Sequence, residues 1–546
     1  MGRTVRIAVA IALVAGSLSV HAQVAERKPK LIVLLMVDQM RADYVDKFQA
    51  QWTGGLHRLV SAGAWFRQAS YPFFDTVTCA GHTTVVTGTL PSTHGMVMNE
   101  WWDRDRRVEV PCTEDRAVAP VSYGKPVSGP GDSASAIRVP SIADELKAQL
   151  SPAPRVISFS MKARSAIPMG GRAPDAVAWF DDTGTWVTST AFAQSPVPAV
   201  ADFIRRHPIE EDFDKVWERS LPLSAYLYDA VAAGANVPPG RTPSFPHPLK
   251  DRSHGVDPAD YDRWQDSPFS DEYLAEMALD VASHMRLGQG SGPDLLAVSF
   301  SALDKVGHDF GPNSHEIQDV LVRLDRTLER FFSQVDRLAG GDSIVVLSAD
   351  HGVAPLPEWL RPRGISSGRI SDVALAQAIQ TALFERLGAG DYVSGIVNGD
   401  VYLSGGVLER LLASPSLLEA VRRSLKRIPG VQDVVTRDRL ATGAARDDAE
   451  RRLARSYDAE RSGDLFIVQA PYWTIRDGGT GHGSPYDYDS RVPIFMMGKG
   501  IVAGEYLAPA SPADIAPTLA FLAGITLPQV QGRVLTEALV PVKPNR

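Results

Sequence analysis

Aspartate and histidine residues recur where apolar stretches of this chain end. In an open α/β sheet, the carboxyl ends of the strands meet along one edge, and ligands bind there. Six oxygen and nitrogen donors gathered at that edge would hold two Zn²⁺-like ions, and paired metals perform phosphoryl transfer or hydrolysis. The donors are Asp38 after the run 31–37, Asp304 and His308 after 295–300, Asp350 and His351 after 343–348, and His482 in the glycine-rich loop 478–483.

A nucleophile could come from the threonine-rich segment 76–84. The segment precedes residues 85–88, which we interpret as the start of a helix, and the N–H groups of a helix N-terminus suit a phosphate. A threonine hydroxyl attacks well only when a metal or a base lowers its pKa. Residue types alone do not choose among the four threonines, and each could instead cap a helix or pack in the core: Thr76, Thr78, Thr83 and Thr84.

Strand and helix patterns alternate along the chain. The continuous apolar runs 31–37, 295–300 and 343–348 are typical of strands buried on both faces. A long helix begins after Ser314, has apolar residues at three- and four-residue spacing, and ends at Gly340-Gly341. Weaker strands are expected at 155–160, 175–180 and 492–497. We therefore predict an α/β fold with a doubly wound, mostly parallel central sheet flanked by helices. His315, in the first turn of the long helix, is expected to be exposed.

Three stretches are interpreted as insertions, near 101–140, 205–270 and 357–478. The last has its own pattern of helix 373–387, strand 394–403, helix 417–427 and strand 431–436. Because it separates Asp350 and His351 from His482, we interpret it as a cap subdomain.

The first 22 residues have the pattern of a secretory signal peptide. Arg3 and Arg6 precede the apolar stretch 7–14, and small residues lead to a cleavage site after Ala22. An uncleaved anchor is the alternative, but the stretch is shorter than the ~18 residues that a spanning helix needs. We expect residues 23–546 to form a catalytic domain in the periplasm or outside the cell, without stable membrane insertion.

The charge and the cysteines add two constraints. The net charge is −8, and loss of Arg3 and Arg6 makes it −10, which argues against a nucleic-acid partner. The two cysteines, Cys79 and Cys112, are expected to pair in an oxidising compartment, and two free thiols are the alternative.

Seven stretches of the chain also match a known family in its order. Asp304 to Pro312 reads Asp-x-x-Gly-His-x-x-Gly-Pro, and 349–352 contains Asp-His-Gly. The chain thus resembles the alkaline phosphatase superfamily, in particular the threonine-nucleophile, phosphate-irrepressible bacterial enzymes of the type I phosphodiesterase/nucleotide pyrophosphatase group. The remaining matches are 36–41, 76–82, 95–99, 161–166 and 479–483.

The resemblance assigns roles to individual residues. It implies an exported alkaline phosphatase that hydrolyses small-molecule phosphate monoesters at two Zn²⁺ ions through a phosphothreonine intermediate. Thr78 matches the nucleophile, Asn99 an asparagine that binds a phosphoryl oxygen, and Lys162 and Arg164 a cationic pair near the phosphoryl group. Asp38, Asp350, His351 and Thr78 match the ligands of one zinc, and Asp304, His308 and His482 those of the other. His82 and His94 would be surplus as ligands and are expected to be structural or supporting. Mn²⁺ is compatible with the same ligand types.

The cationic pair also distinguishes among substrates. In an extended segment, residues i and i+2 point the same way, so Lys162 and Arg164 could reach one phosphoryl group. Two cations favour a monoester, which carries about two negative charges, over a diester, which carries about one.

Three other functions compete with this one. A phosphodiesterase or nucleotide pyrophosphatase would share Thr78, Asn99 and both metals, and the cationic pair argues against it. A sulfatase would need proline and arginine where Gly81 and Thr83 follow Cys79. A catalytically inactive metal- or phosphate-binding module would not need the complete set of donors and nucleophile. The sequence does not indicate the physiological ester or the oligomeric state.

Overall fold

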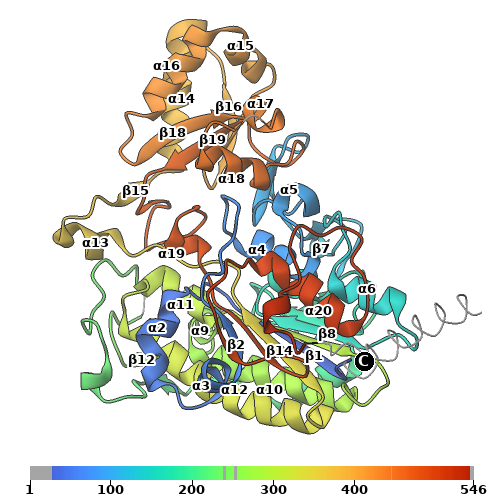
Figure 1. Ribbon diagram of the computed structural model, residues 1–546. Coiled ribbons are helices and arrows are strands. Elements are labelled where there is room, and N and C mark those ends of the chain that lie inside the picture. The colour runs from blue at the N-terminus through green and yellow to red at the C-terminus, as the bar shows by residue number, and fades with distance from the viewer. Residues whose placement is uncertain (1–27, 238–240, 251–254, 444, 542–546) are drawn as a thin grey trace, which may run out of the picture.

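The computed structural model describes residues 28–237, 241–250, 255–443 and 445–541 (Figure 1). The expected signal peptide, residues 1–22, lies outside the described residues. Within these ranges, no helix has both the length and the apolar character needed to cross a bilayer.

A ten-stranded mixed sheet forms the centre of the molecule, in the order β22-β2-β21-β14-β1-β13-β8-β9-β10-β6. The five strands from β14 to β9 run parallel to one another, as the continuous apolar runs predicted. The fold class is therefore confirmed, although antiparallel neighbours flank the parallel centre, β21 beside β14 and β10 beside β9. The strands are β1 (Leu31–Val37), β2 (Ala64–Phe66), β6 (Pro120–Ser122), β8 (Val156–Ser160), β9 (Ala176–Phe180), β10 (Trp186–Ser189), β13 (Asp294–Phe300), β14 (Ser343–Ser348), β21 (Ile494–Gly498) and β22 (Gly504–Tyr506).

Helices cover both faces of the sheet because its central strands are apolar on both sides. Leu31, Val33 and Leu35 of β1 pack into one buried cluster with residues of α2, α3, α10 and α12. Ile32 and Leu34 pack into a second cluster, with residues of α4, α6 and α20. The helices are α2 (Asp43–Phe48), α3 (Gly55–Ala62), α4 (Thr78–Thr87), α5 (Pro91–His94), α6 (Ile142–Gln149), α7 (Ala163–Gly170), α8 (Pro198–Arg206), α9 (Pro258–Gln265), α10 (Pro268–His284), α11 (Ala302–Phe310), α12 (His315–Ala339), α13 (Pro357–Leu360), α19 (Asp487–Ser490) and α20 (Ile515–Ala523).

A smaller unit rises from one end of this body, shown in orange at the top of Figure 1. Its four-stranded sheet has the order β16-β17-β19-β18, and its own apolar cluster lies between the sheet and α14, α15 and α16. β15 and β20 pair in parallel where the chain leaves and re-enters the body. The elements are β15 (Gly368–Ile370), α14 (Asp372–Leu387), β16 (Val393–Val397), β17 (Asp400–Leu403), α15 (Val407–Ala413), α16 (Pro415–Leu425), β18 (Val431–Thr436), α17 (Arg437–Ala441), α18 (Asp448–Ser456), β19 (Leu465–Gln469) and β20 (Trp473–Ile475). We call residues 368–475 the cap.

Two local expectations were wrong. Residues 394–403 are not one strand but the hairpin β16–β17, because Asn398-Gly399 forms its turn with both residues at positive φ. His315 is buried, with 2% exposure, because the segment 219–228 folds over the start of α12. The Nε2 atom of His315 lies 2.6 Å from the carbonyl oxygen of Tyr228, and Arg219 donates to its Nδ1 atom.

Candidate active site

The predicted donors converge at the carboxyl edge of the parallel strands. Asp38 follows β1 directly, and Asp350 and His351 follow β14. Asp304 and His308 lie four residues apart on α11, which begins just after β13, so they share one helix face. His482 comes from the loop between β20 and α19. These side chains therefore lie together at one edge of the sheet, as their positions after the apolar runs predicted.

One group of possible metal ligands consists of Asp38, Asp350 and His351. All three are fully buried. The Nε2 atom of His351 lies 3.4 Å from Asp38 Oδ1 and 3.3 Å from Asp350 Oδ2. The hydroxyl oxygen of Thr78 is 3.4 Å from the same Nε2 atom. These four residues are the set that the resemblance assigns to the first zinc.

A second group contains Asp304 and His482, with His351 shared between the groups. His308 stands beside it, because its Nε2 atom lies 3.2 Å from Asp304 Oδ1. The imidazoles of His308 and His482 have their centroids 5.2 Å apart, and the rings of His351 and His482 stack at 3.5 Å. The two groups therefore adjoin.

The three histidines are held in the same tautomer by main-chain carbonyls. The Nδ1 atoms of His308, His351 and His482 lie 2.8–2.9 Å from the carbonyl oxygens of Thr480, Gly352 and Thr76 respectively. A carbonyl only accepts, so each Nδ1 carries the proton, and each Nε2 presents a lone pair to the site. Burial also lowers the pKa of His351, and burial with the neighbouring imidazoles lowers that of His482 well below its usual value. Neutral, oriented imidazoles are what a metal centre requires.

Two carboxylate oxygens in the site have no hydrogen-bond donor. Asp38 Oδ1 and Asp350 Oδ2 are buried without such a partner among the described residues. Burial, together with the carboxylates of Asp304 and Asp350, raises the pKa of Asp38 well above its usual range. A buried carboxylate is costly unless a cation or a donor compensates it, so this donor set fits metal ions.

Among the four candidate threonines, only the Thr78 hydroxyl faces the donor groups. Thr78 is the first residue of α4 and is buried. The other hydroxyls have partners elsewhere: Thr76 donates to the carbonyl of Ser484, Thr83 to that of Cys79, and Thr84 lies 3.0 Å from His94 Nε2. The geometry thus favours Thr78 as the nucleophile.

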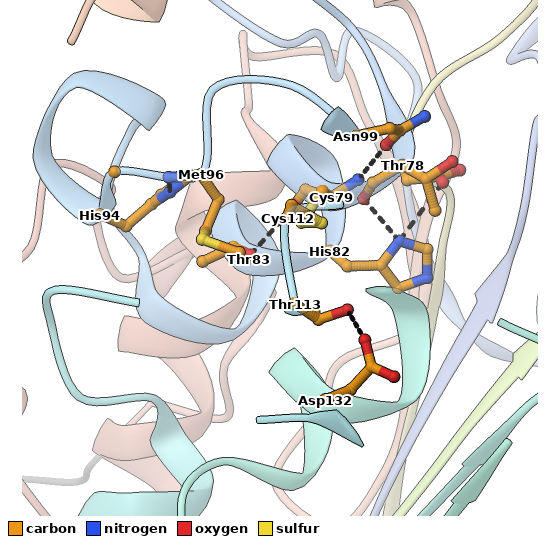
Figure 2. Close-up of a disulfide and its surroundings, with 12 residues drawn as sticks. Thr78, Cys79, His82, Thr83, His94, Met96, Asn99, Cys112, Thr113 and Asp132 are labelled. Carbon is orange, nitrogen blue, oxygen red and sulfur yellow. Dashed lines mark hydrogen bonds and ion pairs between the residues drawn. A yellow bond between two sulfur atoms is a disulfide. The ribbon is translucent and has the colours of Figure 1, made fainter. Parts of the chain in front are cut away.

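Asn99 is anchored to the start of α4. Its Oδ1 accepts the N–H of Cys79 at 2.9 Å, as Figure 2 shows, and this bond leaves the amide nitrogen for other acceptors. Cys79 forms the expected disulfide with Cys112, whose own N–H donates to the carbonyl of Asn99 at 2.8 Å. The disulfide and these two hydrogen bonds hold Asn99 beside Thr78.

Lys162 and Arg164 lie near the donors, but the expectation that both belong to one extended segment was wrong. Lys162 immediately precedes α7, and Arg164 lies in the first turn of that helix. The Nζ atom of Lys162 is 2.5 Å from both Asp38 Oδ2 and Asp304 Oδ2. Burial disfavours the ammonium, but the two carboxylates outweigh it and raise the pKa of Lys162. Arg164 lines a cavity of about 270 Å³ together with Asn99, His308 and His482.

The sequence reasoning missed one supporting residue. Gln39, at a φ of 68°, gives its main-chain N–H to Asp350 and its side-chain amide to Asp304 Oδ1 at 2.6 Å. No residue-type signal marks such a role. His82 is supporting, with Nδ1 2.9 Å from the carbonyl of Thr78, and His94 lies 3.0 Å from the Thr84 hydroxyl.

The chain is similar to known proteins over most of its length. The family model of type I phosphodiesterase / nucleotide pyrophosphatase matches residues 32–487. Alkaline phosphatase PhoV of Synechococcus elongatus is 31% identical over 522 residues, which cover 94% of this chain and 93% of PhoV. Alkaline phosphatase PafA of Elizabethkingia meningoseptica is 30% identical over 539 residues, which cover 97% of this chain and 98% of PafA.

Solved structures show the same relationship. The crystal structure of wild-type PafA has a TM-score of 0.86, covering 94% of this chain and 99% of that one. Murine ectonucleotide pyrophosphatase / phosphodiesterase 5 is 12% identical with a TM-score of 0.54, covering 93% of this chain and 100% of that one, a likeness of fold alone.

Proposed function

The chain belongs to the type I phosphodiesterase / nucleotide pyrophosphatase family and is a phosphoric monoester hydrolase, and from this premise we propose how it works. It is an exported alkaline phosphatase that transfers the phosphoryl group of small monoesters to Thr78 and then to water. The observation that carries this proposal is the Thr78 hydroxyl, 3.4 Å from the Nε2 of a buried, tautomer-fixed His351 and beside two adjoining groups of donors.

The donor set fits two metal ions, which we assign as Zn²⁺. Asp38, Asp350, His351 and Thr78 would hold one, and Asp304, His308 and His482 the other. The donors are carboxylates, imidazoles and one hydroxyl without thiolate, which is typical of catalytic rather than structural zinc. When bound, such ions lower the pKa of a hydroxyl or a water and neutralise phosphoryl oxygens. Metal analysis of the active protein separates Zn²⁺ from Mn²⁺.

The residues of this chain perform two displacements. In the first, the Thr78 hydroxyl loses its proton and its oxygen forms a bond to phosphorus, while the bond from phosphorus to the ester oxygen breaks and the departing alcohol takes up a proton. In the second, a water oxygen displaces Thr78 from the phosphothreonine, giving inorganic phosphate and restoring the hydroxyl. The amide nitrogen of Asn99 and the guanidinium of Arg164 donate to phosphoryl oxygens, and these hydrogen bonds strengthen as charge develops.

Replacing the nucleophile tests the proposal. Thr78→Ala should reduce phosphomonoester turnover by at least about 10³-fold, because covalent catalysis is lost. Metal content measured by inductively coupled plasma mass spectrometry should stay close to that of the wild type, since the aspartates and imidazoles remain. Thr84→Ala is the matched control and should remain active. Wild-type turnover by Thr78→Ala would mean that another group is the nucleophile.

A phosphodiesterase is the second candidate, because the family includes such enzymes. The two cations beside the site favour the monoester, whose second negative charge they can bind. The double variant Lys162→Ala with Arg164→Ala should lower kcat/KM for an aryl phosphate by roughly 100-fold more than for the corresponding bis-aryl phosphate. This difference is expected because each hydrogen bond to a charged group contributes ~1.5–3 kcal/mol. Equal losses would show that the pair is structural, and a wild-type preference for the diester would reverse the assignment.

A further inference from the structure

One side of the active-site cavity is lined by residues that the proposed reaction does not use. The cavity of about 270 Å³ is lined by Asn99, Arg164, His308 and His482. Further lining residues come from three separate segments. These additional residues are Glu100, Val397, Asn398, Ile475 and Arg476.

The cap supplies two of these residues through its β16–β17 turn. The amide nitrogen of Asn398 approaches Gly483, where an added Cβ would meet it at 2.7 Å. Gly483 has a φ of 100° and directly follows His482, so only glycine suits this backbone conformation. The cap therefore contacts the His482 loop, and its turn contributes Val397 and Asn398 to the lining of the cavity.

Arg476 places a guanidinium at the same wall. Its Cδ contacts Gly481, at 3.6 Å from an ideal Cβ position there, and its Nε donates to the carbonyl of Gly478 at 3.0 Å. Its Nη1 lies 2.9 Å from His308 Nδ1. That Nδ1 already gives its proton to the carbonyl of Thr480, so it cannot accept from Arg476. The Nη1 atom is therefore turned toward the imidazole of His308, whereas Nη2 donates to none of the described residues and remains for a ligand in the cavity.

The position of Arg476 indicates which part of a substrate it meets. In an in-line displacement, the attacking and departing oxygens lie on opposite sides of phosphorus. The nucleophile Thr78 stands beside His351, whereas Arg476 stands beside His308 in the other donor group. The departing alcohol therefore faces the wall formed by Arg476 and the cap turn.

We propose that Arg476 is a specificity-determining residue that favours monoesters whose leaving group carries a second anionic group. This inference rests on the proposed function and names its preferred substrate class. The guanidinium fork matches a carboxylate or a phosphate, and either would form charge-assisted hydrogen bonds with it. Glu100, on the lining of the same cavity, repels an anion and directs it to the arginine.

A matched series of esters tests the proposal. Carboxyphenyl phosphate and carbamoylphenyl phosphate, substituted at the meta and para positions, have almost the same shape but differ by one charge. The wild type should favour the carboxylate at one of these positions. Arg476→Gln should lower the carboxylate-to-carboxamide ratio of kcat/KM on the order of fivefold, a modest effect because Arg476 is exposed to solvent. Glu100→Gln should raise the same ratio.

Controls separate this role from others. Arg427→Gln removes one positive charge from the exposed surface of the cap and should leave the ratio unchanged. If Arg476→Gln lowers kcat/KM for both esters equally, Arg476 does not distinguish the charge of the leaving group and the proposal is overturned. A wild type that hydrolyses neither ester would refute the proposed function itself. Phosphonophenyl phosphate in the same series shows whether the subsite takes a phosphate-like group as well as a carboxylate.

Discussion

Removal of the Cys79–Cys112 disulfide should lower the free energy of unfolding. Cys79 and Cys112 are buried at 0% and 1% exposure, and their separation of 33 residues encloses α5 and the segment that carries Asn99. Cys79 also directly follows Thr78, the proposed nucleophile. The perturbation is the double variant Cys79→Ala with Cys112→Ala. Alanine suits the apolar surroundings, which include Met96 and Ala166, better than serine, whose hydroxyl would lack a partner.

The magnitude follows from the length of the closed loop. Opening a loop of this length returns chain entropy to the unfolded state worth about 4 kcal/mol at 25 °C. The free energy of unfolding should therefore fall by about that amount. The native hydrogen bonds of Asn99 to Cys79 and Cys112 are made by main-chain N–H groups, which the variant keeps. The loss of kcat/KM should consequently be smaller than that caused by Asn99→Ala.

Urea titration of the metal-loaded protein, followed by circular dichroism, measures the change. The wild type should show the same loss after treatment with dithiothreitol, whereas the double variant should not respond to the reductant. A free energy of unfolding within about 1 kcal/mol of the wild type would refute the entropic reasoning. A response of the variant to dithiothreitol would show that the reductant acts elsewhere.

Two further predictions concern positions outside the catalytic groups. Gly81→Ala should lower both metal content and turnover, because the new Cβ would lie 2.4 Å from the carbonyl oxygen of Asp350. Gly290→Ala is the control and should change neither, because an added Cβ there has no atom within 4 Å. Metal analysis and a phosphatase assay measure both effects. Burial raises the pKa of Asp271 to about 7, so folding favours its protonated form, and the stability that this provides at pH 4 is lost as the pH rises to 7. The free energy of unfolding of Asp271→Asn, measured by urea titration, should therefore rise relative to that of the wild type by about 1.4 kcal/mol per pH unit between pH 5 and pH 7. A difference between the two proteins that does not vary with pH would contradict this.

The metal-ligand candidates of the site could be predicted from the sequence because they follow apolar runs that are recognisable as strands. Asp38, Asp304 and Asp350 each come within a few residues after an apolar run, and the parallel strands carry them to one edge. Such a pattern depends only on local order along the chain. Thr78 could not be chosen from the four threonines by residue type and spacing, because the choice depends on which hydroxyl points toward the donor groups.

Long-range contacts explain what the sequence reasoning missed. Gln39 has an ordinary residue type, and its role arises from bonds to Asp304 and Asp350, hundreds of positions away. His315 is buried because a distant segment folds over it. The Asn398-Gly399 turn is different, since this dipeptide is a recognised hairpin signal, and only the assumption of one continuous strand concealed it.

The paired strands β15 and β20 have a consequence for how such enzymes diversify. Gly368 lies opposite Trp473 and Ile370 opposite Ile475, so the chain departs and returns at neighbouring positions. An inserted unit with adjacent ends can be exchanged between homologues without a change in the strand order of the central sheet. Recombination at this one junction would transplant the Asn398 turn into a new protein while Thr78 and its partners stay where they are. The cap's share of the cavity lining could thus be inherited separately from the reaction chemistry, whereas Arg476, which directly follows β20, would stay with the body.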